Sequence, residues 1–258
     1  MKDVQNQKDS RNIYLHQVGI RGLKYPVIIK NYEGEMVPVS GEVDLFVDLE
    51  GEQKGTHMSR FVEVLTQYHK MDLSDIRHLL RDIREKLEAE NSFCKVDFDY
   101  YIWKKSPVTG GGAYLAVGVE YEAALKGDDL EFEMTVRTPV TTLCPCSKEI
   151  SDYSAHNQRA IVSITLRTSH YIWIEDVARI AEDSSSCPVY SLLKRPDEKF
   201  VTEKAYDNPK FVEDVARDAK LMIDEMEGVQ SYIIEVESLE SIHNHSAYAR
   251  VEGVGMGI

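Results

Sequence analysis

Hydrophobic positions follow a strand period and then a helix period, and this order occurs twice along the chain. In the first half, β-branched and aromatic residues flank a turn signal, Asn-Tyr-Glu-Gly, at residues 31–34, which predicts a β-hairpin. Asp72 is predicted as the N-cap of the second of two helices. The first half is thus predicted to contain a hairpin within residues 14–49, helices at 58–68 and 73–87, and strands at 92–105 and 113–125.

The second half repeats this order. Asn208 and Pro209 are predicted to be the N-cap and first position of its second helix, and residues 184–207 are predicted to form a long loop. The elements expected here are strands at 130–144 and 159–174, helices at 174–181 and 208–226, and strands at 230–240 and 247–258.

Both halves therefore have the predicted order ββααββ, which indicates an internal duplication into modules at residues 1–127 and 128–258. Each module is expected to be an antiparallel sheet with a helix pair on one face, an α+β architecture. The open sheet edges of such modules favour side-by-side assembly into a barrel-like oligomer.

Composition narrows the class of protein. The chain has 258 residues, 43% of them hydrophobic, and at this length it needs neither disulfides nor a structural metal to be stable. Its 30 Lys and Arg against 44 Asp and Glu give a formal charge of −14, which argues against nucleic acid as a partner but allows a phosphorylated metabolite. The N-terminal sequence lacks the apolar core of a signal peptide, and no run approaches the ~18 apolar residues of a membrane span. We expect a cytoplasmic protein without a membrane partner.

Two thiols stand two residues apart at Cys144 and Cys146, with Pro145 between them. Proline biases the preceding residue toward an extended conformation, in which side chains two residues apart share a face. Their Cα atoms would then be ~6.6 Å apart, at the upper limit of disulfide geometry. The spacing therefore favours two free thiols that point into one pocket.

Further candidate metal ligands follow this pair. His156 lies ten residues after Cys146, Glu198 falls in the predicted loop, and His243 and His245 repeat the spacing of two residues. A thiolate, an imidazole and a carboxylate would complete an open, three-ligand Zn²⁺ site. A lone Cys-x-Cys is more often structural or incidental, so the hypothesis depends on the concurrence of these residues.

Five segments of the chain resemble type IB GTP cyclohydrolase I, the prokaryotic enzyme that makes 7,8-dihydroneopterin triphosphate. The resemblance spans essentially the whole chain and implies the tunnelling fold, with two ββααββ modules per chain and a homotetramer whose active sites form between subunits. The segments are KGTHMSRF (54–61), TTLCPCSKEIS (141–151), YSAHNQR (153–159), LLKRPDEKFVTEKAYDNPKFVEDVAR (192–217) and ESIHNHSAYA (240–249).

The resemblance implies that Cys144, His156 and Glu198 bind the metal, which can be Zn²⁺, Mn²⁺ or Fe²⁺. Opening guanine requires water to add at C8, and a bound metal can lower the pKa of that water toward neutrality. Cys146 would act beside C8 in proton transfer or in holding the hydrated intermediate. His243 and His245 would serve the proton transfers of formate release and ribose rearrangement.

The resemblance also implies the residue that recognises guanine, and local charge indicates the residues that bind the triphosphate. Glu213 matches the glutamate that anchors guanine, whose N1–H and 2-amino group can both donate to one carboxylate, although an exposed helical glutamate is the default interpretation. His57, Ser59 and Arg60 begin the first predicted helix, where free N–H groups favour a triphosphate.

Two alternatives remain open at this stage. One is another tunnelling-fold enzyme such as a nitrile reductase, although the Glu-Ser-Lys motif of that family is missing from this chain. The other is a metal-binding protein without enzymatic activity, which would not explain Glu213 or the basic helix start. The sequence leaves open whether the product feeds folate or modified tRNA bases.

Overall fold

The computed structural model describes residues 5, 7–68 and 70–255 and divides into two compact units of mostly antiparallel strands and helices. The first unit comprises residues 1–99 and 120–133, and the second comprises residues 100–119 and 134–258. Three long strands contribute residues to both units. The α+β class is thus confirmed, whereas the division into modules at residue 127 stays a prediction. Within the described residues, no helix is long and apolar enough to cross a membrane.

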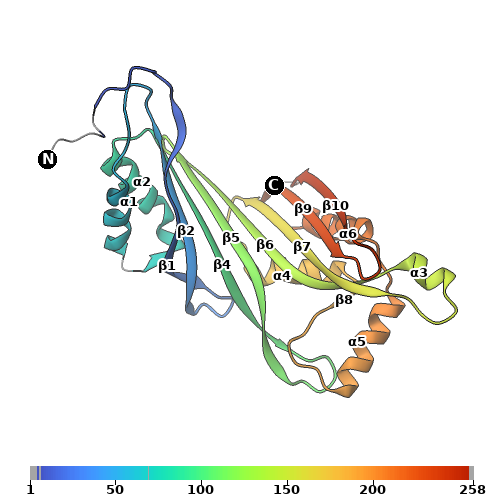
Figure 1. Ribbon diagram of the computed structural model, residues 1–258. Helices are drawn as coiled ribbons and strands as arrows, with labels where there is room; N and C mark the ends of the chain where they lie inside the picture. Colours follow the sequence, from blue (N-terminus) through green and yellow to red (C-terminus); the bar gives the residue numbers. More distant parts are fainter. Residues whose placement is uncertain (1–4, 6, 69, 256–258) are drawn as a thin grey trace. The chain divides into compact units, whose positions relative to one another are not determined.

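The first unit is built on a hairpin that carries two helices on one face (Figure 1). Its strand order is β3-β1-β2-β4. The elements are β1 (Leu15–Lys30), β2 (Met36–Leu49), α1 (Met58–Leu65), η1 (Thr66–Tyr68), β3 (Met71–Asp72), η2 (Leu73–Asp75), α2 (Ile76–Leu87) and parts of β4 (Asn91–Lys105), β5 (Gly112–Lys126) and β6 (Asp129–Leu143).

The predicted turn at residues 31–34 is confirmed. Asn31 accepts a hydrogen bond from the Glu35 N–H at 2.7 Å, and Gly34 takes a φ of 83°, a left-handed value that glycine adopts at low cost. Phe61 and Leu80, on the buried faces of α1 and α2, are fully inaccessible. The helix pair therefore covers the hairpin as the helical spacing predicts, although α2 begins after Asp75 and not after Asp72.

The second unit has the strand order β10-β9-β7-β6, with the short β8 paired to β6. Helices α4 and α6 contact each other, α4 contacts β7, and α6 contacts β9 and β10. Besides parts of β4, β5 and β6, the elements are α3 (Pro145–Ile150), β7 (Asn157–Thr168), α4 (Ile174–Ser184), β8 (Cys187–Pro188), α5 (Arg195–Asp207), α6 (Val212–Asp224), β9 (Val229–Leu239) and β10 (Ser246–Val254).

The predictions for residues 184–207 and for Asn208 are wrong. The segment 184–207 is not a long loop, because its second part forms α5. Asn208 is the C-cap of α5 and not the N-cap of the next helix, which starts at Val212 with Phe211 as its N-cap. The Asn208 side chain instead donates to the carbonyl oxygens of Ser185 and Ser186, at 3.0 and 3.2 Å.

Helix α5 is anchored by the buried carboxylate of Asp197 in its first turn. One oxygen accepts from the N–H groups of Val108 and Thr109, both at 2.9 Å. The other accepts from the Thr109 hydroxyl at 2.7 Å and from the Lys194 N–H at 2.9 Å. The loop between β4 and β5 is therefore tied to the start of α5.

Candidate functional site

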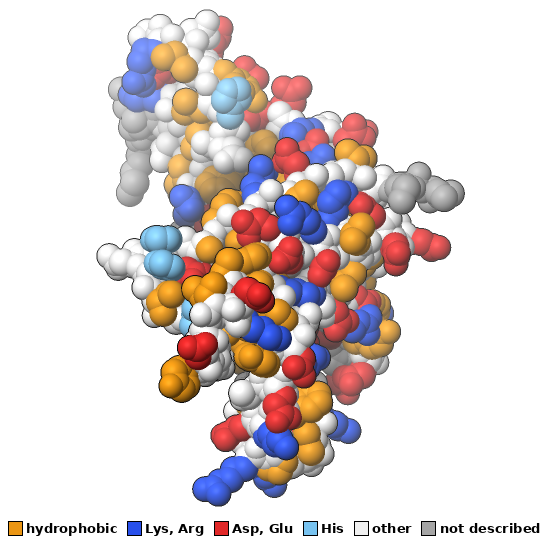
Figure 2. All heavy atoms as spheres, turned by 90° about the vertical axis from the view of Figure 1, so that its right-hand side faces the viewer, with side chains coloured by type: hydrophobic (Ala, Val, Ile, Leu, Met, Phe, Trp, Pro, Cys, Tyr) orange, Lys and Arg blue, Asp and Glu red, His pale blue; other side chains and the backbone are white. Residues whose placement is uncertain are grey.

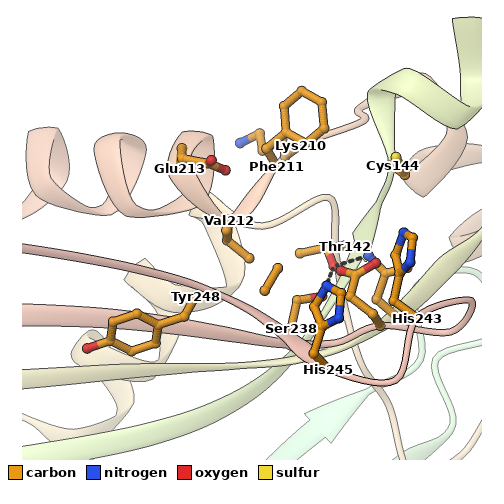
Figure 3. A pocket seen from close by; sticks show the side chains of 13 residues that line it. Thr142, Cys144, Lys210, Phe211, Val212, Glu213, Ser238, His243, His245 and Tyr248 are labelled. Atoms are coloured by element: carbon orange, nitrogen blue, oxygen red, sulfur yellow. Dashed lines mark hydrogen bonds between the residues drawn. The ribbon is translucent and has the colours of Figure 1, made fainter.

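A cavity of about 270 Å³ lies in the second unit, where β6, β7, β9 and β10 meet the start of α6. Figure 3 shows Glu213, Phe211 and Lys210 on one wall and the imidazoles of His243 and His245 on the opposite wall. The cavity is lined by Thr142, Cys144, Gln158, Lys210, Phe211, Val212, Glu213, Ser238, Glu240, His243, His245, Ala247 and Tyr248. Four predicted site residues, Cys144, Glu213, His243 and His245, are thus brought to one cavity.

Cys144 stands at the junction of β6 and α3 and is half-buried. Its backbone is extended, as the following proline requires, and Pro145 begins the helix. The thiol sulfur accepts the Ser147 N–H at 3.4 Å and so acts as the N-cap of α3. Cys144 is also one of the residues that line the cavity.

His156 is held beside Cys144 by its own backbone. Its N–H donates to the Ser147 hydroxyl at 3.2 Å, and its carbonyl oxygen accepts the Cys144 N–H at 3.2 Å. In the side chain, Nδ1 lies 2.9 Å from Oε1 of Gln158 and 3.2 Å from Oγ of Ser241. Nε2 is therefore the ring nitrogen that a metal would take.

Glu198 lies on the exposed side of the first turn of α5. In the part of the chain that the structure describes, no three His, Cys, Asp or Glu side chains form a group that could hold a metal ion. The chemistry of the donor set nevertheless suits a metal, because a thiolate, an imidazole and a carboxylate are accepted ligands. The hydrogen-bonded Nδ1 of His156 also matches the usual support of a ligating histidine.

Cys146 lies within α3, is exposed, and is not among the residues that line the cavity. The expectation that both thiols share a strand face is wrong, because the extended backbone ends at Cys144 and the helix starts at Pro145. The catalytic role of Cys146 stays a prediction.

Glu213 occupies the second position of α6 and is exposed at the cavity wall. The start of this helix is fixed by the Asp214 side chain, which accepts the Phe211 N–H at 3.0 Å. Lys210, just before this N-cap, is also held in place. Its ammonium donates to the Ser184 carbonyl at 2.9 Å and lies 2.8 Å from the Asp218 carboxylate. The wall that carries Glu213 is thus held in place by neighbouring side chains.

His243 and His245 lie between β9 and β10, and both are exposed. Their rings are stacked, with centroids 5.2 Å apart and an angle of 18° between planes. The prediction that the two imidazoles point to one side is confirmed.

The residues predicted for the triphosphate belong to the first unit. His57 is the N-cap of α1, and Ser59 and Arg60 lie in its first turn. Arg60 donates to the Lys86 carbonyl at the end of α2, at 3.4 Å. On the face shown in Figure 2, Lys and Arg side chains are interspersed with Asp and Glu side chains and form no large basic patch.

Several polar residues of the cavity were not predicted as site residues, among them Thr142, Gln158 and Ser238. Thr142 and Ser238 are almost fully buried. Alternate residues of β6 and β9 point inward, and Thr142 and Ser238 are the last residues of these inward-facing rows. The sequence signal that identifies them is a polar residue at a position where the alternation of the strand predicts a buried apolar residue.

Comparisons with known proteins give a consistent family match. The sequence profile described as "Type I GTP cyclohydrolase folE2" matches residues 1–249. A "GTP cyclohydrolase FolE2" from Thermotoga maritima is 50% identical over 252 residues, covering 98% of this chain and 97% of the relative. Proteins with the same description from Fervidobacterium nodosum and Thermosipho africanus are 49% and 47% identical, with 96% and 100% of each chain covered.

Solved structures show a likeness in fold. The uricase from Bacillus fastidious matches with a TM-score of 0.55 over 95% of this chain and 94% of that chain, at 8% identity. The uricase from Arthrobacter globiformis matches with a TM-score of 0.50 over 93% of each chain, also at 8% identity. At such low identity, these likenesses concern the fold alone.

Proposed function

Because the chain belongs to the type I GTP cyclohydrolase folE2 family, we propose that it opens the guanine ring of GTP at the cavity lined by Cys144 and Glu213. The reaction is the hydrolytic opening at C8, release of formate and rearrangement to 7,8-dihydroneopterin triphosphate. The observation that carries the proposal is the gathering of Cys144, Glu213, His243 and His245 around one cavity. The family match favours this activity over a nitrile reductase or a metal-binding protein without activity.

The metal ligands in this proposal are Cys144, His156 and Glu198. A bound divalent metal supplies the Lewis acidity that makes a water nucleophilic near neutral pH. The backbone hydrogen bond between Cys144 and His156 supports two of the three ligands, and Glu198 would approach from α5. The ligand types accept Zn²⁺, Mn²⁺ or Fe²⁺, so the choice of metal is a matter for metal analysis.

Different side chains serve the guanine base, the proton transfers and the triphosphate of the substrate. Glu213 accepts the two N–H donors of guanine, while His243 and His245, on the opposite wall, exchange protons during formate release. In a homotetramer whose active sites form between subunits, Cys146 would act near C8, and His57, Ser59 and Arg60 would bind the triphosphate at the start of α1.

We further propose the tunnelling fold with two ββααββ modules, at residues 1–127 and 128–258, and a homotetramer with active sites between subunits. The order of strands and helices supports the fold, although the second half contains the additional elements α3, β8 and α5, and the likeness to uricase supports it as well. The exposed aromatic and aliphatic side chains of β10, Tyr248 and Val254, support an edge that pairs with another copy. A cytoplasmic location stays a prediction from the sequence.

The test is to incubate purified protein with GTP and with Zn²⁺, Mn²⁺ or Fe²⁺ in separate reactions. We expect equal amounts of formate and of a pterin that becomes fluorescent on oxidation. The matched controls are Glu213→Gln, which should lose activity, and Glu225→Gln, an exposed glutamate at the other end of α6, which should keep it. Failure to form formate with each of the three metals would contradict the proposed reaction.

A further inference from the structure

Gln158 lies between Thr142 and His156 and lines the cavity. We propose that Gln158 is a positioning residue that keeps the ring proton of His156 on Nδ1 and thereby turns the lone pair of Nε2 toward the metal. The inference rests on the proposed function, in which His156 is a metal ligand. It concerns one amide group, whose two ends contact Thr142 and His156.

The direction of the Gln158 amide follows from its two contacts. Nε2 donates to the hydroxyl of Thr142 at 3.1 Å, and Oε1 faces Nδ1 of His156 at 2.9 Å. The Thr142 hydroxyl is itself 3.2 Å from the hydroxyl of Ser238, so it can accept from Gln158 while it donates to Ser238. If the amide were reversed, its oxygen would need the Thr142 proton and its NH₂ group would face the imidazole.

The amide direction decides the tautomer of His156. A carbonyl oxygen only accepts hydrogen bonds, so the Nδ1 that faces it at 2.9 Å carries the proton. The Ser241 hydroxyl, 3.2 Å from the same nitrogen, can accept from it as well. With the proton on Nδ1, the lone pair of a neutral imidazole is on Nε2, the form that ligates a metal.

The sheet explains why this arrangement is rigid. Thr142 and Ser238 are each 1% exposed, and they end the buried faces of β6 and β9, which flank β7 in the strand order. Gln158 lies on the same face of β7 as the buried Ala160 and Val162. The strands therefore hold both hydroxyls in place, and Gln158 has a hydrogen-bonding partner at each end of its amide.

The first measurement reports the tautomer in the metal-free protein. Long-range ¹H–¹⁵N spectra of the His156 ring, in alkaline buffer where imidazoles are neutral, separate Nδ1–H from Nε2–H. We expect Nδ1–H in the wild type and in Gln158→Glu, whose carboxylate also accepts. In Gln158→Met the acceptor is lost, and we expect a substantial Nε2–H population. Gln230→Met, a matched change at an exposed position of β9, should leave the spectrum unchanged.

The second measurement is the affinity for Zn²⁺ alone, by competition with a chelator. Loss of a side chain that supports a ligating histidine commonly weakens metal binding by about 10–100-fold. We expect a loss in this range for Gln158→Met and near wild-type affinity for Gln158→Glu. This readout does not depend on turnover.

A double variant separates positioning from simple loss of packing. Thr142→Val removes the partner of the Gln158 NH₂ group, so the amide is free to turn, and we expect Nε2–H to appear and zinc affinity to fall. Both oxygens of a carboxylate accept hydrogen bonds, so either one can face Nδ1 of His156. Thr142→Val combined with Gln158→Glu should therefore retain the Nδ1–H tautomer and bind zinc more tightly than Thr142→Val alone.

The inference is overturned if folded Gln158→Met keeps both the wild-type ring spectrum and the wild-type zinc affinity. It is equally overturned if Thr142→Val shifts the tautomer and Gln158→Glu fails to restore it. A distinct result tests the proposed function: if His156→Ala binds zinc as tightly as the wild type, His156 is not a ligand. In that case the ligand assignment fails, and the ring spectra alone decide whether Gln158 sets the tautomer.

Discussion

The main-chain N–H of Cys144 donates to the carbonyl oxygen of His156 over 3.2 Å, which joins the end of β6 to the start of β7. This bond fixes the spacing of the two proposed ligands through the backbone and leaves both side chains for the metal. A site built in this way needs no metal to bring these two residues together.

We therefore expect Cys144→Ser and His156→Ala to lose bound metal and activity while the fold survives. Each should lower metal affinity by at least about tenfold, because one of three ligands is removed. Metal content after dialysis and the far-UV circular dichroism spectrum check the two parts of this expectation. His78→Ala, an exposed histidine of α2, is the control and should keep the metal. Equal metal content in Cys144→Ser and the wild type would refute the assignment.

Cys146 offers a contrast with Cys144, because its thiol lies on α3 outside the cavity. Cys146→Ala should retain the metal but lose turnover, since the step at C8 loses its thiol. Metal analysis and formate release on the same preparation distinguish the two roles. Full turnover in this variant would show that Cys146 is an ordinary surface residue.

Glu213 is expected to set the preference for guanine. In Glu213→Gln, one acceptor is replaced by an amide donor that faces the donors of the base. An unmatched pair of this kind costs ~1–3 kcal/mol, so GTP affinity should fall at least about tenfold.

ITP, which lacks the 2-amino group, supplies the discriminating comparison for Glu213. Titration calorimetry should show that the wild type prefers GTP and that Glu213→Gln largely loses the preference, while Glu225→Gln retains it. An undiminished preference in Glu213→Gln would place the guanine anchor elsewhere.

Asp197 is expected to make the stability of the second unit depend on acid pH. Burial alone would raise the pKa of this carboxyl, but hydrogen bonds from Thr109, Lys194 and Val108 outweigh burial and hold the pKa below its usual value. A carboxyl with a lowered folded pKa stabilises the fold above its unfolded pKa of ~3.9, and this contribution is lost as pH falls below that value.

Asp197→Asn should therefore be less stable than the wild type at neutral pH, because an amide cannot accept all four hydrogen bonds. The difference should shrink as the pH is lowered through ~4, where the wild-type carboxylate begins to lose its advantage. Urea denaturation at a series of pH values measures both. Asp207→Asn, at the exposed C-terminal end of α5, is the control. A pH-independent difference would mean that the charge of Asp197 contributes nothing.

Assembly has its own test. If active sites form between subunits, light scattering at working concentration should give the mass of about four chains, and dilution below the dissociation constant should lower specific activity. A fully active monomer would exclude shared sites.

The sequence predicts those parts of the fold in which a periodic apolar pattern reports burial. The hairpin at residues 31–34, the stripes of α1 and α2 and the strands of the second half all follow such patterns. Helix α5 was not predicted because it buries only Asp197 and Ala205, so it has no apolar stripe to detect. Its polar character is consistent with a helix that is held by one buried carboxylate.

The candidate site was predicted in part for a related reason. Cys144, Glu213, His243 and His245 carry recognisable chemistry, and the structure brings them to one cavity. Gln158 carries no such signal, since its role depends on which strands are neighbours. The error at Cys146 has a local cause. Pro145 favours an extended conformation for Cys144 before it and also starts a helix, so Cys146 after it is helical.

The hydrogen bond between the hydroxyls of Thr142 and Ser238 joins residues 96 positions apart in the chain. A ribosome that makes this protein has therefore finished β6 and β7 long before it reaches β9 and the two histidines after it. A nascent chain can present Cys144 and His156 but lacks Ser238, His243 and His245 until synthesis is nearly complete. Chains that end before β9 are thus expected to lack Ser238, His243 and His245, and with them the activity that we propose for this cavity.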